Sequence, residues 1–357
     1  MMHNSDVSEA KPSDEMVTMC GPSTKFASVA LTMAALIAVA EVGPGALSAK
    51  ELRLSDHGPA PEFTGISNWL NSSPLPVASL QGKVVLIQFW TFSCINSLRA
   101  LPYAKKWHET YKDKGFTVIG VHSPEFAFEK ETSNVKTAIE RFGITYPVPQ
   151  DNAFRTWNAY RNYAWPGEYL IDKSGKLVAI QFGEGNYGQI ENAIAKLVGA
   201  SVSDAAPDDP GLGAIGSPEM YFGTEENVNG VLEKRLHASA IVSAQSASAG
   251  ERVYTAPDDV PLNRFAFSGT WKISADNATL LTNDGEILLR FRAPKVNIVA
   301  GSPSSQPLSI TVDGQPQPQV TVQDSRLYSL YSGPPGEHLL HLKIPKAGLS
   351  AFSFSFG

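Results

Sequence analysis

Cysteine is scarce in this sequence, which has two among 357 residues, Cys20 and Cys94. Cys20 lies in a segment that we expect to be removed on export, so Cys94 has no second sulfur ligand beside it. Without one, and without a close histidine pair, we expect no metal, and we expect no other cofactor. Basic clusters are also few, and the net charge of −6 at pH 7 argues against nucleic acid as a partner. The apolar content of 43% and charged content of 18% are typical of a globular protein.

Long hydrophobic runs are equally rare, and the one run that approaches a membrane span lies near the start, from 26 to 40. Lys25 precedes this run, and small residues up to Ala49 follow it, which is the pattern of a secretion signal cleaved near that point. An uncleaved anchor helix is the alternative, although the run is short for a span. We therefore expect residues 1–49 to be a signal region, and the protein to be periplasmic or otherwise exported.

Removal of the signal would also remove Cys20 and leave Cys94 as a single thiol that has no internal disulfide partner. Cys94 follows a continuous apolar run, 84–90, and precedes an amphipathic stretch that ends at Gly115. A sulfur in the first turn of a helix faces unpaired N–H groups and the positive end of the helix dipole, and both favour the thiolate. We therefore predict that Cys94 is a nucleophile. A buried, inert cysteine is the alternative.

The pattern along the chain predicts two domains. Strand and helix signals alternate over 60–200 and include a hairpin before a last helix, which predicts an α/β fold with a mixed sheet. Segment 201–261 begins rich in Pro, Gly, Ser and Asp and is predicted to be a linker. Short alternating runs fill 262–357, with hairpin signals at Asp284–Gly285 and Asp313–Gly314, so this part is predicted to be an all-β sandwich or jelly roll.

Several motifs together resemble a known family. They are "VVLIQFWTFSC", "GVHSPEFAFE", "WPGEYLID", "GEGNYGQIENAI" and the closing "FSFSFG". The sequence resembles the thioredoxin-like superfamily, and within it the soluble region of the DipZ-type thiol–disulfide interchange proteins. The resemblance covers nearly all of the expected mature chain. It implies a thioredoxin-like redox domain, a β-sandwich similar to a carbohydrate-binding module, and protein disulfides as substrates.

The resemblance also implies roles for particular residues. Trp90 lies in the stretch that leads to the active site, and Trp165–Pro166 falls where the superfamily carries its cis-proline loop. These three residues are therefore expected to dock the substrate chain beside Cys94, because free backbone groups at such a loop can pair with an extended peptide. An ordinary turn proline before Gly167 is the alternative.

The sequence departs from the DipZ-type pattern at Ser97, which stands where the Cys-x-x-Cys motif has its second cysteine. A serine hydroxyl cannot attack a mixed disulfide, so release of the product is expected to need an external thiol. The multi-span part that supplies electrons in DipZ-type proteins is also absent from this sequence. The reductant is thus expected to be an external thiol or a membrane electron donor.

Proton transfer needs a group other than Gln88, which occupies the strand position where thioredoxins carry a buried acid. Glu125 and His122 are the candidates, because the strand before them should end at the active-site edge. The alternative is that Glu125 is an exposed loop residue and His122 a packed one.

Our leading hypothesis is an exported thiol–disulfide oxidoreductase that performs monothiol exchange or isomerisation. One alternative is a peroxiredoxin-like peroxidase, since Thr91 and Cys94 form a Thr-x-x-Cys pair. The other is a redox-idle binding protein that acts through its sandwich, where Trp271, Tyr328 and Tyr331 could stack on sugar rings of a glycan. Such aromatic residues are more often part of a sandwich core.

Overall fold

The computed structural model describes residues 52–202, 215–228, 231–234, 240–242, 244–245 and 248–357. The expected signal region 1–49, including Cys20, lies outside the described residues. Across the part that is described, no helix is both long enough and apolar enough to cross a membrane.

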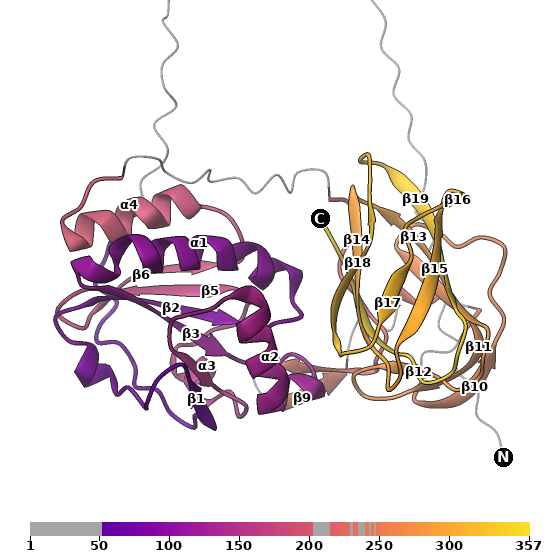
Figure 1. Cartoon of the computed structure of the whole chain (residues 1–357), viewed down its shortest axis with the longest axis horizontal. Helices are drawn as coiled ribbons and strands as arrows, with labels where there is room; N and C mark the ends of the chain where they lie inside the picture. Colours follow the sequence, from indigo (N-terminus) through magenta and orange to yellow (C-terminus); the bar gives the residue numbers. More distant parts are fainter. Residues whose placement is uncertain (1–51, 203–214, 229–230, 235–239, 243, 246–247) are drawn as a thin grey trace, which may run out of the picture. The chain divides into compact units, whose positions relative to one another are not determined.

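The first domain is built on a six-stranded sheet with the strand order β1-β4-β3-β2-β5-β6 (Figure 1). The central strands β2, β3 and β4 are parallel, whereas β1, β5 and β6 run antiparallel to their neighbours. The predicted mixed sheet is therefore confirmed. The strands are β1 (Asn68–Leu70), β2 (Val84–Trp90), β3 (Phe116–His122), β4 (Val148–Gln150), β5 (Gly167–Ile171) and β6 (Leu177–Phe182).

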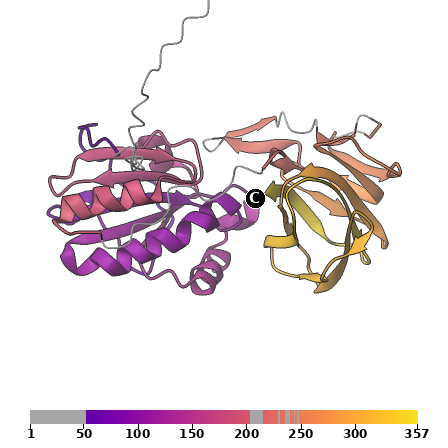
Figure 2. The ribbon, with the colours of Figure 1, turned by 90° about the horizontal axis from the view of Figure 1, so that it is seen from above.

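Helices cover both faces of this sheet, as Figures 1 and 2 show. Successive side chains of β2 point to opposite faces. Leu86 and Trp90 pack in the core under α1 and α4, while Ile87 and Phe89 pack in a second core with α3. Burial on both faces explains why β2 is a continuous apolar run. The helices are α1 (Ile95–Tyr111), α2 (Thr132–Phe142), α3 (Arg155–Ala159) and α4 (Tyr187–Val198).

Helix α1 leads to Gly115 as the sequence predicts, whereas the segment 127–142 is divided into two parts. Helix α1 continues into a short 3₁₀ turn, η2 (Lys112–Lys114), and ends at Gly115 in the left-handed conformation, as predicted. Residues 127–142 do not form one continuous helix, because the chain is divided at Glu131, whose backbone is extended. A 3₁₀ turn, η3 (Ala127–Lys130), precedes the break, because the Glu129 carboxylate holds the backbone N–H groups before it.

The second domain is a single antiparallel sheet of twelve strands that curls around one apolar core. The all-β prediction is confirmed. Two strands, β7 (Met220–Tyr221) and β10 (Gly250–Tyr254), come from the segment expected to be a linker, so the domain begins earlier than predicted. The other strands are β11 (Arg264–Ile273), β12 (Ala278–Leu280), β13 (Gly285–Arg292), β14 (Lys295–Gly301), β15 (Gln306–Val312), β16 (Gln315–Pro316), β17 (Val320–Val322), β18 (Arg326–Ser332), β19 (Glu337–Ile344) and β20 (Ser350–Phe356). A separate hairpin is formed by β8 (Glu225–Val228) and β9 (Val231–Lys234).

The two predicted hairpin turns have different outcomes. Asp313–Gly314 joins β15 to its antiparallel neighbour β16, as predicted. The prediction for Asp284–Gly285 is wrong, because β12 and β13 do not pair with each other. Both pair with different parts of the long strand β11, which turns between these parts at Gly269 (φ 97°).

The two domains are in contact within one compact unit of the chain. Phe126 and Phe128 of the first domain pack against Phe352 of the second, with ring centroids 5.2 and 4.8 Å apart. On the other side of α1's first turn, Arg99 Nη2 donates a hydrogen bond of 2.9 Å to the carbonyl of Phe356. The second domain therefore contacts the first turns of α1.

Candidate active site

Cys94 lies at the junction of β2 and α1. It has an extended backbone and forms the N-cap of α1, and its carbonyl accepts the hydrogen bond from Leu98 N at 3.0 Å. The predicted placement of this thiol at a helix start is therefore confirmed. Cys94 is also the single cysteine among the described residues, and it is 6% exposed.

The prediction that the helix start makes this thiol acidic is wrong for this structure. The backbone N–H groups of Ser97 and Asn96 do lower the pKa of Cys94, as a helix N-terminus should. Burial of the sulfur outweighs them, and the carboxylates of Glu125 and Glu219 add to it, so that the pKa of Cys94 is raised well above its usual value. In this arrangement the resting sulfur is a thiol.

Ser97 is completely buried one turn into α1. Its hydroxyl oxygen accepts a hydrogen bond from Thr91 N at 3.4 Å, while its backbone N–H faces the sulfur of Cys94. The side chain therefore ties the loop before Cys94 to the helix after it.

The loop before β5 provides the other wall of the site. The Trp165–Pro166 peptide bond is cis, as the resemblance implied, and the Cys94 thiol points at the Trp165 carbonyl with a sulfur–oxygen distance of 3.9 Å. Trp165 is half-buried and Pro166 is buried. The third expected docking residue, Trp90, is wrongly assigned, because it is fully buried under α1 and donates to Gly120 O at 3.1 Å.

Glu125 is joined to the second domain by a tyrosine. The hydroxyl of Tyr221 in β7 lies 2.7 Å from Glu125 Oε1 and 3.0 Å from Glu219 Oε2. Glu125 is 8% exposed, so the expectation of an exposed loop residue does not hold. Both carboxylates act electrostatically on Cys94. Of the two residues predicted to transfer a proton, Glu125 is therefore the one that the fold brings within electrostatic range of the thiol.

His122, the other residue proposed for proton transfer, is a packed side chain. It is fully buried, its ring stacks on Phe92 at 5.6 Å, and its Nε2 lies 3.5 Å from Thr91 Oγ1. Burial lowers the pKa of His122 to about 3, so the ring is neutral at physiological pH. A ring with so low a pKa takes up a proton poorly near neutral pH, so His122 is a weak base at this site.

A buried acid that the sequence did not reveal, Glu129, organises the loops around Cys94. Its carboxylate accepts hydrogen bonds from Ser93 Oγ at 2.6 Å, Ser93 N at 3.2 Å, Glu125 N at 2.6 Å and Phe126 N at 3.0 Å. Four donors compensate for much of the cost of burying a carboxylate. Because Ser93 directly precedes Cys94, Glu129 fixes the approach to the thiol.

A second missed acid, Glu168, compensates for the glutamine at the usual acid position. Glu168 faces Gln88 across β2 and β5, and Gln88 Nε2 donates to Glu168 Oε1 at 3.0 Å. Burial raises the pKa of Glu168 to about 7, and its Oε2 has no hydrogen-bond partner among the described residues. The signal in the sequence was a single acid inside the otherwise apolar strand after the cis-proline.

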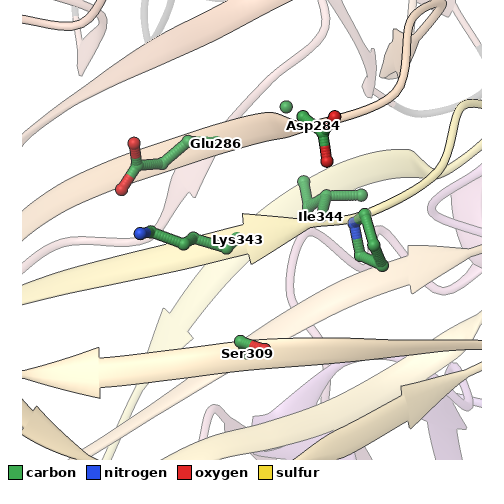
Figure 3. A pocket seen from close by; sticks show the side chains of 7 residues that line it. Asp284, Glu286, Ser309, Lys343 and Ile344 are labelled. Carbon is green, nitrogen blue, oxygen red and sulfur yellow. The ribbon is translucent and has the colours of Figure 1, made fainter.

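The second domain has a surface hollow of about 380 Å³ between β13, β15 and β19. Figure 3 shows Glu286 and Lys343 side by side on neighbouring strands, with Ser309 on the next strand. None of the described residues that line this hollow is aromatic. Of the residues expected to stack on sugars, Trp271 and Tyr328 are buried at 0% and 4% exposure, as sandwich core residues are. Tyr331 is partly buried and packs on the same core, so glycan contact stays a prediction.

The described residues contain no group of three or more His, Cys, Asp or Glu side chains that could hold a metal ion. Cys94 lies beside two carboxylates, the start of a helix and the backbone carbonyl of Trp165, which precedes a cis-proline. The chemistry that this arrangement supports is centred on this thiol.

Comparison with known proteins assigns both domains to families. Residues 57–180 match the AhpC/TSA family, and residues 217–357 match the family described as the thioredoxin-like C-terminal domain. The second match begins close to β7, where the structure also begins the second domain.

The chain is similar to the DipZ proteins of Mycobacterium bovis and Mycobacterium tuberculosis, at 36% identity over 324 residues. The match covers 85% of this chain and 44% of each DipZ, so the chain spans less than half the length of these relatives. The thiol-disulfide oxidoreductase YkuV of Bacillus subtilis is 28% identical over 39% of this chain and 94% of its own length. A solved thioredoxin-like protein in the oxidised form aligns at 28% identity over 41% of this chain and 96% of its own, with a TM-score of 0.37.

Proposed function

We propose that the chain, whose residues 57–180 match the AhpC/TSA family and whose residues 217–357 match the thioredoxin-like C-terminal domain family, is a single-cysteine thiol–disulfide oxidoreductase. The observation that carries this proposal is the placement of Cys94. Its sulfur faces the N–H groups of Asn96 and Ser97 on one side and the Trp165 carbonyl on the other. A thiolate formed there is stabilised by the helix start, and a substrate disulfide can align along the loop before β5.

The reaction is an exchange in two steps. The Cys94 thiolate attacks one sulfur of a protein disulfide, so that a mixed disulfide forms, the substrate S–S bond breaks and the other substrate sulfur leaves as a thiolate. An external thiolate, or another cysteine of the substrate, then attacks the mixed disulfide and releases Cys94. Ser97 cannot perform this second step, so the chain alone gives exchange or isomerisation. Net reduction requires a second external thiol or a membrane electron donor.

Attack requires the Cys94 proton to leave first, because the resting thiol has a raised pKa. We assign this proton to Glu125, a nearly buried carboxylate that acts electrostatically on the thiol and is held by the Tyr221 hydroxyl. Burial of the site disfavours the thiolate at rest and protects the sulfur from oxidation. Export to a periplasm or similar compartment, where such disulfides occur, is part of the same proposal.

The test is the rate at which purified protein exchanges with bis(2-hydroxyethyl) disulfide in the presence of glutathione. We expect the wild type to accelerate exchange and Cys94→Ala to show the uncatalysed rate, while both proteins unfold at similar temperatures. Equal rates for the two proteins would remove the basis of the proposal. A peroxidase would instead lose its thiol rapidly to hydrogen peroxide.

A further inference from the structure

A cavity of about 250 Å³ lies beside the first turn of α1, immediately after Cys94. Asn96, Arg99 and Glu184 line it from the redoxin domain, and Glu219, Ser355 and Phe356 line it from the C-terminal domain. Water occupies about 30 Å³ per molecule in the liquid, so the cavity has room for several waters or for a short side chain. The proposed exchange reaction makes no use of this space.

Two buried polar groups of the cavity have no hydrogen-bond partner among the described residues. Glu184 is 5% exposed, and its Oε1 accepts a salt bridge of 2.8 Å from Arg99 Nη1. Its Oε2 is buried and has no hydrogen-bond partner among the described residues, and the same holds for the Ser355 hydroxyl, which is 3% exposed. A buried carboxylate oxygen and a buried hydroxyl without partners are costly unless a ligand or water supplies donors.

The charges of the cavity favour a cation. Arg99 has its two terminal nitrogens occupied by Glu184 Oε1 and the Phe356 carbonyl, at 2.8 and 2.9 Å. The cavity is therefore lined by two carboxylates, those of Glu184 and Glu219, and by one guanidinium, which already has hydrogen-bond partners. Glu219 in turn is linked through the Tyr221 hydroxyl to Glu125, so that the negative charge extends from the cavity to the thiol.

We propose that this cavity binds a primary ammonium group carried by the substrate disulfide a few bonds from the sulfur that Cys94 attacks. The inference rests on the proposed exchange function and specifies its substrate class. The ammonium donates to Glu184 Oε2 and to the Ser355 hydroxyl, which lack donors among the described residues, and its charge is also attracted to the Glu219 carboxylate. The attack itself is unchanged: the Cys94–sulfur bond forms, the substrate S–S bond breaks, and the departing thiolate takes up a proton.

The test compares three disulfides of similar length that differ in charge. Cystamine is cationic, bis(2-hydroxyethyl) disulfide is neutral and dithiodiglycolate is anionic, and each rate with Cys94 is divided by its rate with glutathione. We expect normalised rates to favour cystamine over the neutral compound by about tenfold at low salt, with a smaller preference at high salt, because the charges interact across a partly shielded cleft.

Amino-acid substitutions test the role of the cavity separately from the exchange reaction itself. Glu184→Gln and Glu219→Gln should each reduce the preference for cystamine, whereas Glu109→Gln, an exposed residue paired with Lys112 near the far end of α1, should leave it unchanged. Glu219→Gln should also raise the rate with the neutral disulfide, since it removes a negative charge that acts on the thiol. A faster neutral reaction shows that this variant is folded.

The outcomes distinguish the two proposals. If no disulfide reacts, the exchange function and this inference both fail. If all three react at equal normalised rates, or if both cavity variants keep the cystamine preference, the exchange function stands and the cavity assignment is overturned. Two peptides whose disulfide is flanked by lysine or by norleucine identify the source of the amine: a preference for the lysine peptide indicates a protein side chain, and a preference confined to cystamine indicates a small aminothiol.

Discussion

The hydroxyl of Tyr221 in the C-terminal domain donates a hydrogen bond of 2.7 Å to Glu125 in the redoxin domain. The same hydroxyl lies 3.0 Å from Glu219, so one tyrosine holds two carboxylates that both act on the Cys94 thiol. The C-terminal domain thereby contributes to the protonation state of a cysteine that is more than 120 residues away in the sequence. Its part in this site is electrostatic.

The first prediction concerns the charge of Glu125. Glu125→Gln removes a negative charge near Cys94 but keeps an oxygen that can accept from Tyr221, so we expect the pKa of Cys94 to fall. The measurement is the pH dependence of Cys94 alkylation. Glu109→Gln, which changes an exposed carboxylate paired with Lys112, is the control. A pKa that is equal in both variants would contradict the role given to Glu125.

The second prediction concerns Ser97, which faces Cys94 from one turn into α1. Residues three apart on a helix are neighbours, so Ser97→Cys should form an internal disulfide with Cys94 on mild oxidation. The variant should then reduce insulin in the presence of a dithiol, while the wild type accumulates mixed disulfides. Asn96→Cys is the matched control, because residues two apart do not face each other. Mass spectrometry that finds no internal disulfide in Ser97→Cys would contradict this geometry.

The third prediction concerns the dependence of stability on pH. The folded state raises the pKa of Glu168 from 4.5 to about 7, so between these values it holds a proton that the unfolded chain has released. Stability from this group is therefore complete below pH 4.5 and is lost as the pH rises through 7. Glu168→Gln should be more stable than the wild type at pH 8, by at most about 3 kcal/mol, and similar at pH 4.

Urea unfolding of both proteins from pH 4 to pH 8 measures this difference. His122 acts in the opposite direction, because its lowered pKa costs stability as the pH falls below 6.5. It does so in both proteins, so subtraction removes its contribution. A difference in the free energy of unfolding that is constant across this pH range would show that folding does not raise the pKa of Glu168.

The fourth prediction concerns Gly167, the residue after the cis-proline. A Cβ atom at this position would collide with the side-chain amide of Asn162, which donates to Ala164 O at 2.9 Å and accepts from Tyr169 OH at 3.1 Å. Gly167→Ala should therefore destabilise the protein by about 1–3 kcal/mol. In an Asn162→Ala background the same change should cost less, since the colliding group is gone. Equal costs in both backgrounds, measured by urea unfolding, would contradict this contact.

Much of the fold was determined by the sequence alone. The buried run of β2, the helix after Cys94, the hairpin of β5 and β6 and the cis-proline before it were all predicted, because each depends on local pattern or on a motif that resembles a family. The same holds for the all-β character of the second domain. The sequence also placed Cys94 at a helix start, since a strand run and an amphipathic run meet there.

The chemical state of the thiol was decided by the tertiary structure. The helix start predicted an acidic cysteine, but burial and the carboxylates of Glu125 and Glu219 reverse the direction of its pKa shift. Glu168 likewise becomes the buried acid because β5 lies beside β2 and aligns it with Gln88, 80 residues earlier in the chain. A pKa depends on desolvation and on charges within a few ångströms, and packing selects those neighbours from distant parts of the chain. Sequence therefore located the thiol at the start of the helix, and packing determined the direction of its pKa shift.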